Sequence, residues 1–139
     1  MKKILVPVDG SENASRVVRH VLTLAGELRE PLDIHLLNVQ HPFPGTIKGV
    51  AEQARQYHQE QGEAALAGAR KLLDDAKVKY SYHVSVGEAA PTVAKFAGEL
   101  QCDLVIMGTR GMGSLANMVM GSVATKVLHL VHVPVMLVK

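Results

Sequence analysis

Residues 3–11 read Lys-Ile-Leu-Val-Pro-Val-Asp-Gly-Ser, and they carry the first strong fold signal in the chain. The part up to Val8 is short, apolar and rich in branched side chains, which is typical of a strand buried on both faces. The next three residues have turn chemistry, and Ser11 suits the N-cap of a helix. Apolar residues then recur at helical spacing from Val17 to Leu28. The sequence therefore predicts a strand, a turn and an amphipathic helix in succession.

This alternation of strands and helices continues to the end of the chain. Further strands are predicted at 34–39, 78–86, 103–107 and 133–138, and further helices at about 49–76, 91–100 and 122–130. Apolar and polar residues alternate in 78–86, which suits an edge strand. Strands that alternate with helices need crossover connections, and these produce a parallel sheet with helices on both faces. We therefore predict an α/β fold with an open, doubly wound (Rossmann-like), five-stranded parallel sheet, formed as a single domain by residues 1–139. In such sheets ligands bind at the carboxyl ends of the strands, where the strand order reverses.

Composition and charge narrow the class of protein. The formal net charge of +2 is too small to indicate nucleic-acid binding, and no apolar run approaches the roughly 18 residues that cross a bilayer. Pro7 and Asp9 also interrupt the N-terminal apolar stretch well before the length of a signal peptide. The single cysteine, Cys102, suits a reducing compartment and is expected to be a buried, inert thiol. We therefore expect a cytoplasmic protein without membrane or nucleic-acid partners.

The segment after the strand predicted at 103–107 carries the clearest chemical signal. It places glycine at 108, 111, 113 and 121, and Gly121-Ser122 opens a predicted helix. Glycine lets a ligand approach the backbone closely, and the amide groups and dipole of a helix start favour phosphate. Ser122 adds a hydroxyl donor and Arg110 a charged one. No carboxylate side chain follows Asp103, so the region is locally cationic and indicates a polyphosphate ligand.

Three other motifs fit this chain less well. A Walker A loop requires a glycine-lysine pair, and the chain contains none. Residues 111–116 imitate the dinucleotide fingerprint, but that motif needs an acidic residue about 20 positions later, and none follows here. The nucleophile elbow of hydrolases, Gly-x-Ser-x-Gly, is absent. On spacing alone, a glycine loop without any ligand stays open as an alternative.

The spacing Gly108-x2-Gly111-x9-Gly121-Ser122 resembles the signature of the ATP-binding branch of the universal stress proteins. The opening Lys-Ile-Leu-Val-Pro-Val-Asp-Gly-Ser, the approach Asp-Leu-Val-Ile-Met-Gly and the closing His-Val-Pro-Val-Met-Leu-Val-Lys resemble the same family. The order of the predicted elements also agrees along the whole chain. The resemblance implies a small nucleotide-binding domain that holds ATP on its glycine-rich segment.

The resemblance also implies which residues meet the nucleotide. Asp9 would lie near the ribose or a bound metal, and the backbone of Val39 would meet the adenine. Arg110 and Gly111 would line the phosphate tail. Ala124 stands where some relatives carry a hydroxyl residue, so one phosphate hydrogen bond would be missing while the backbone donor remains. The complete implied set is Pro7, Val8, Asp9, Val39, Met107, Gly108, Arg110, Gly111, Gly121, Ser122, Val123 and Ala124. Members of this branch can carry Mg²⁺ or Mn²⁺ with the triphosphate, and Asp9 is the carboxylate available to such a cation.

Three functions stay open at this stage. The first is an ATP-binding regulatory or stress-response domain with little or no turnover, because a phosphate cradle is present without evident machinery for cleavage. The second is a slow Mg-dependent ATPase that uses Asp9 and Arg110. The third is a nucleotide-independent interaction protein, as in family members that lack the glycine signature.

The last predicted strand, Val133 to Val138, is apolar throughout although it would lie at a sheet edge. An uncovered apolar edge invites pairing with another chain. The family resemblance implies homodimerisation through this strand, so we predict a two-fold symmetric dimer.

The remaining histidines and aromatic residues are predicted to be structural or exposed. His129 and His132 stand where the last helix ends, and a histidine there favours the helix dipole. His41 follows shortly after Val39 at the mouth of the expected site, but it is interpreted as an exposed loop residue. Tyr57 is predicted to lie on the core face of the long helix.

Overall fold

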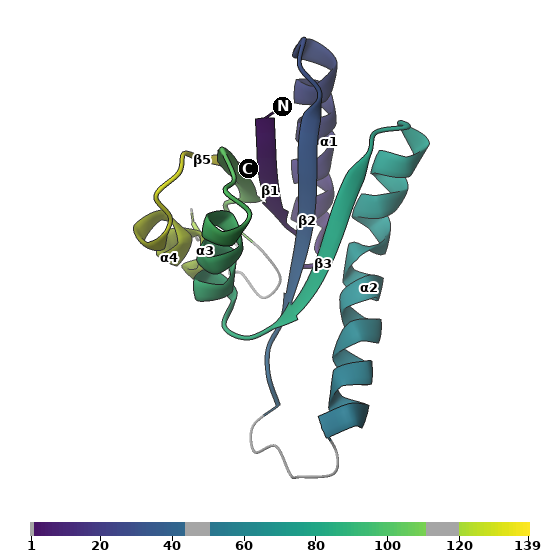
Figure 1. The fold of residues 1–139 in the computed structure, drawn as a ribbon, viewed down its shortest axis with the longest axis vertical. Coiled ribbons are helices and arrows are strands. Elements are labelled where there is room, and N and C mark those ends of the chain that lie inside the picture. Colours follow the sequence, from purple (N-terminus) through teal and green to yellow (C-terminus); the bar gives the residue numbers. More distant parts are fainter. Residues whose placement is uncertain (1, 44–50, 111–119) are drawn as a thin grey trace.

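The computed structural model describes residues 2–43, 51–110 and 120–139. Within these residues, five parallel strands form one sheet in the order β3-β2-β1-β4-β5 (Figure 1). The strands are β1 (Lys2–Pro7), β2 (Leu32–Gln40), β3 (Tyr80–Val86), β4 (Leu104–Gly108) and β5 (Val135–Val138). The helices are α1 (Glu12–Glu27), α2 (Ala51–Asp75), α3 (Ala89–Glu99) and α4 (Ser122–Leu130). The predicted doubly wound α/β fold is confirmed, and the described element boundaries lie within a few residues of the expected ones.

Alternating side chains of the strands divide the core into two layers. On β2, Leu36 belongs to a buried cluster with residues of α1 and α2. The next residue, Leu37, points to the opposite face and packs in a second cluster with residues of α3 and α4. Both leucines are fully buried. The central strands are therefore covered on both faces, which explains their continuous apolar sequences.

The connection from β1 to α1 follows the predicted turn chemistry. Ser11 is the N-cap of α1, and its Oγ accepts the N–H of Ala14 at 3.2 Å. Gly10 has a φ of 82°, which favours glycine, and a Cβ there would lie 3.2 Å from the Cα of Ala65 in α2. The turn thus depends both on its backbone conformation and on the close approach of α2.

The buried face of α2 differs from the expected one near the start of the helix. Tyr57 was predicted in the core but is 48% exposed, whereas its neighbour His58 is buried. The buried positions follow the helical repeat His58, Gly62, Leu66, Ala69 and Leu73. Gly62 belongs to this face because a Cβ there would overlap the side chain of Val84 in β3. Alanine occurs on all sides of this helix, so the apolar pattern does not predict which face of its first turns points to the core.

The two edges of the sheet have different characters. At the β3 edge, the Arg70 guanidinium lies 4.0 Å from the centre of the Tyr82 ring, and polar residues alternate along the strand as predicted. At the β5 edge, all four residues are apolar and half-buried. None of the described helices is both long and apolar enough to span a membrane.

Candidate functional site

A pocket of about 180 Å³ lies at the carboxyl ends of β1 and β4. From β1 the chain proceeds to β2 on one side, while β4 pairs with β1 on its other side, so the strand order reverses at this point. Ligands of open α/β sheets bind at such a switch point. The pocket is lined by Pro7, Val8, Asp9, Ser11, Asn13, Ala14, Leu37, Val39, Ala89, Val93, Met107, Gly108, Thr109, Arg110, Gly121, Ser122, Val123 and Ala124.

Every residue of the implied nucleotide set that the structure describes lines this pocket. Gly111 lies outside the described residues. Sequence reasoning missed seven lining residues, which are Ser11, Asn13, Ala14, Leu37, Ala89, Val93 and Thr109. Leu37 could have been predicted to line the pocket, because it lies two positions before Val39 and therefore on the same face of the strand. Ala89 and Val93 of α3 gave no sequence signal, because small apolar helix residues look alike in a core and in a pocket wall.

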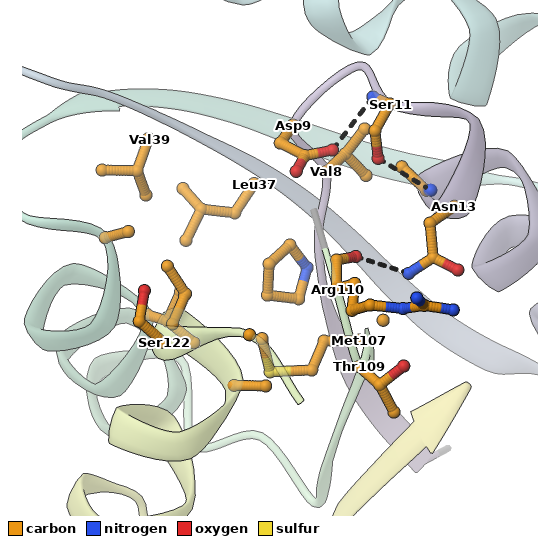
Figure 2. A pocket seen from close by; sticks show the side chains of 18 residues that line it. Val8, Asp9, Ser11, Asn13, Leu37, Val39, Met107, Thr109, Arg110 and Ser122 are labelled. Atoms are coloured by element: carbon orange, nitrogen blue, oxygen red, sulfur yellow. Dashed lines mark hydrogen bonds between the residues drawn. The ribbon is translucent and has the colours of Figure 1, made fainter. Parts of the chain in front are cut away.

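The pocket has one apolar side and one polar side. Figure 2 shows the side chains of Leu37 and Val39 on one side, and those of Asn13 and Arg110 on the other. Asp9 lies at the rim, where its Oδ1 accepts the N–H of Ser11 at 2.9 Å. A ligand that combines a flat apolar group with an anionic tail would match this division.

Helix α4 begins at the pocket, and among the described residues no side chain caps it. Its N-cap is Gly121, whose N–H donates to the carbonyl of Thr109 at 2.5 Å, and no acidic residue occupies its first turn. The amide groups of Ser122, Val123 and Ala124 belong to the first turn, where a helix offers no carbonyl partners. These donors and the positive end of the helix dipole therefore favour an anion.

A buried amide supports the floor of the site. Asn38 of β2 is 3% exposed, and its Nδ2 donates to the carbonyl of Val8 at 2.8 Å. Its Oδ1 accepts from Gln40 Nε2 at 2.7 Å. The bond to Val8 fixes the chain just beyond the end of β1, immediately before Asp9.

Two histidines outside the pocket form a contact that the sequence did not indicate. His35 Nδ1 of β2 lies 3.0 Å from His83 Nε2 of β3, and the two rings stack. Asp33 Oδ1 lies 3.1 Å from His35 Nε2. Burial lowers the pKa of His83, and the neighbouring His35 lowers it further. Among the described residues, no group of three or more histidine, cysteine or acidic side chains is placed to hold a metal ion.

The other predicted structural residues lie largely as expected. His129 is exposed in the last turn of α4, and His41 is exposed and does not line the pocket. Cys102 is buried as predicted, and burial raises the pKa of its thiol. A raised thiol pKa disfavours the reactive thiolate.

The fold and the pocket at its switch point define a Rossmann-like α/β protein with a pocket at the carboxyl ends of β1 and β4. The family model of the universal stress protein family matches residues 1–139. The chain belongs to that family. The universal stress protein MJ0531 of Methanocaldococcus jannaschii is 33% identical over 140 residues, which cover 99% of this chain and 82% of the relative.

Solved structures of similar proteins share the fold. The structure of MJ0577, from the same organism, has a TM-score of 0.84 at 27% identity. The match covers 99% of this chain and 95% of the MJ0577 chain. A universal stress protein of Archaeoglobus fulgidus, solved in complex with dAMP, has a TM-score of 0.69 at 22% identity. That match covers 100% of this chain and 98% of the other.

Proposed function

We propose that this chain binds ATP in the pocket at the switch point and acts as a nucleotide-dependent regulatory or stress-response domain with little or no turnover. The observation that carries the proposal is the start of α4, which no side chain of the described residues caps and which lines the same pocket as Arg110. Amide donors, a helix dipole and a guanidinium together favour a polyanion. The family relative solved with dAMP supports an adenine nucleotide.

The two sides of the pocket suggest how the nucleotide lies. The apolar side at Leu37 and Val39 suits the adenine ring, and the rim at Asp9 suits the ribose hydroxyls. The phosphates then extend toward Arg110 and the first turn of α4, which begins at Ser122. Ala124 contributes no hydroxyl, so its backbone amide is the donor at that position.

A divalent cation would be held mainly by the phosphates. Asp9 is the carboxylate among the pocket-lining residues. Mg²⁺ usually keeps several waters and binds through one or two carboxylates together with substrate phosphates. This donor set therefore fits Mg²⁺ or Mn²⁺ that arrives with ATP better than a cation held by the protein alone.

Hydrolysis is the second candidate, and it depends on Asp9. Cleavage of ATP needs an oriented water, usually a base and a metal, and charge stabilisation at the γ-phosphate. Arg110 can supply the last of these, and Asp9 is the carboxylate placed to serve as base or metal ligand. The variant Asp9→Asn should keep ATP binding and abolish turnover if the chain is a slow Mg-dependent ATPase. Unchanged turnover would exclude that role for Asp9.

The binding proposal is tested by thermal unfolding of nucleotide-free protein with and without ATP and Mg²⁺. ATP at 100 times its dissociation constant adds about 2.7 kcal/mol of stability, which raises the midpoint by several degrees. We expect the rise in the unsubstituted chain and not in a folded Gly121→Val variant. The variant Thr23→Ala, at the far end of α1, is the control and should keep the rise. No rise in the unsubstituted chain would favour the nucleotide-independent interaction protein.

We also propose a cytoplasmic homodimer that pairs through β5. The four residues of this edge strand are apolar and half-buried, and β4 is the strand that pairs with β5 in the sheet. A second copy at this edge would cover them and satisfy the open backbone groups. Sedimentation at micromolar concentration should give a dimer, and Met136→Lys should shift the population to monomers. A stable monomer of the unsubstituted chain would contradict the proposal.

A further inference from the structure

Asn13 links two parts of the pocket that are far apart in the sequence. It is the second residue of α1, and its Nδ2 donates to the carbonyl of Arg110 at 2.6 Å across 97 positions. Because a carbonyl oxygen can only accept, the amide nitrogen is the atom of Asn13 that must face it. Figure 2 shows the two side chains together on the polar side of the pocket. The start of α1 therefore holds the backbone just after β4.

Gly108 makes room for this contact. A Cβ at position 108 would overlap Nδ2 of Asn13 and would lie 3.0 Å from the carbonyl of Arg110. The sequence explanation for this glycine was close approach of a ligand. The structure gives it a second task, because any side chain at 108 would displace the amide of Asn13.

The chain is also held where it returns from residues 111–119. The N–H of Gly121 donates to the carbonyl of Thr109, and the N–H of Thr109 donates to the carbonyl of Val138 at 3.0 Å. Thr109 is thus fixed by β5 and by the N-cap of α4, while Arg110 is fixed by α1. Asn13 provides the contact that α1 makes to this segment.

We propose that Asn13 is a positioning residue that places Arg110 for the outer phosphates and so sets the preference for ATP over AMP. This inference rests on the proposed ATP function. With the Arg110 backbone held, its guanidinium samples fewer positions, and less ordering entropy is lost when it meets phosphate. The gain in affinity grows with the number of phosphates. AMP has only the inner part of the nucleotide, which lies on the apolar side and at α4, away from the guanidinium of Arg110.

The test measures dissociation constants for ATP and AMP by isothermal titration. Asn13→Ala should weaken ATP about five- to tenfold, which is the factor that one hydrogen bond is worth, and should change AMP less than about twofold. Asn13→Asp keeps the size of the side chain but cannot donate, so its ATP affinity should fall at least as far. Thr23→Ala removes a hydroxyl that bonds a backbone carbonyl elsewhere on α1, and it should change neither constant.

A double-mutant cycle with Gly108 tests the mechanism. Gly108→Ala should reduce ATP affinity because it displaces Asn13. In the Asn13→Ala background the same change should cost less than in the unsubstituted chain, since the displaced amide is gone. If the losses of ATP affinity from the two substitutions are additive, Gly108 does not act through Asn13, and the proposed link between the two residues is wrong.

The remaining outcomes separate this inference from the proposed function. Equal losses for ATP and AMP in both Asn13 variants would overturn the role in phosphate preference. An unchanged ATP:AMP ratio with intact ATP binding would overturn it as well, while the ATP proposal would stand. If the unsubstituted chain binds neither nucleotide, the ATP proposal fails and the role of Asn13 fails with it.

Discussion

Helices α1 and α4 both begin at the pocket, but their first turns are built differently. Helix α1 has Ser11 as a side-chain cap and Glu12 in its first turn. Helix α4 has Gly121 at its N-cap and no acidic residue in its first turn, and no side chain in the described part of the chain caps it. The cap of α1 satisfies one of its amides internally, and Glu12 offsets its dipole. Under the proposed function, the amides at the start of α4 meet the phosphates of the ligand instead.

The two helix starts differ in what satisfies their first amides: α1 does so in part with its own side chain, and α4, under the proposed function, with its ligand. A cap stabilises the protein by itself, whereas an uncapped start gives up that stability until a ligand arrives. Helix α1 instead contributes through Asn13, which reaches across to Arg110. One helix therefore shapes the pocket, and the other presents the donors.

The largest expected effect comes from making α4 resemble α1. Ser122→Asp places a carboxylate in the first turn of α4, where it interacts favourably with the helix dipole and repels phosphate. At about 5 Å and an effective dielectric of about 20, one charge pair costs about 3 kcal/mol. We expect roughly a hundredfold weaker ATP binding by isothermal titration, with an unchanged or slightly higher unfolding midpoint. Ser122→Asn is the neutral control, and similar losses in both variants would contradict the electrostatic explanation.

The next effect tests the support beneath the start of α1. Asn38→Ala removes the donor to the Val8 carbonyl and leaves that group buried without this partner. Such a loss costs about 1–3 kcal/mol, so the unfolding midpoint should fall by several degrees. Gln40→Ala removes the half-buried partner of Asn38 and should cost less. Equal midpoints for the Asn38 variant and the unsubstituted chain would show that Val8 does not depend on this bond.

A smaller effect is expected when the cap of α1 is removed. Ser11→Ala loses the bond from the Ala14 N–H, which should lower the free energy of unfolding by about 1 kcal/mol. Denaturant unfolding measures this change, and Ser15→Ala, which is not at a capping position, is the control. Because α1 uses its own cap, the loss should appear in stability more than in ATP affinity. A larger change in ATP affinity than in the free energy of unfolding would contradict the role of Ser11 as an internal cap.

The smallest effect concerns pH and lies away from both helix starts. The pKa of His83 is lowered in the folded protein by burial and by His35, so the unfolded chain takes up the proton more readily. Above the ordinary histidine pKa of about 6.5, His83 does not reduce the free energy of unfolding. As the pH falls from there through the folded pKa, the unfolded chain binds the proton first, and the free energy of unfolding decreases. The unfolding midpoint should therefore decrease on acidification, and His83→Gln should flatten that decrease. The variant Thr23→Ala, which removes no titratable group, is the control and should leave the slope unchanged.

Much of the fold could be predicted because its signals are local. The apolar strands, the cap at Ser11 and the alternation of elements each depend on neighbours in the chain, and together they imply the parallel sheet. The described part of the implied nucleotide set also lies in one pocket, since strand ends in a parallel sheet meet at one edge. Tyr57 was misplaced because the rotation of a helix depends on what it packs against, and the alanines of α2 carry little directional information.

The sequence by itself determined the order of strands and helices, the class of sheet and the glycine-rich approach to α4, because these follow from periodicity, turn chemistry and backbone freedom. The tertiary structure alone decided that Asn13 meets Arg110, that His35 meets His83, and that Gly108 serves a side chain from another helix. These contacts join residues 48 or more positions apart. Their geometry depends on how whole elements pack, and no local pattern in the chain encodes it.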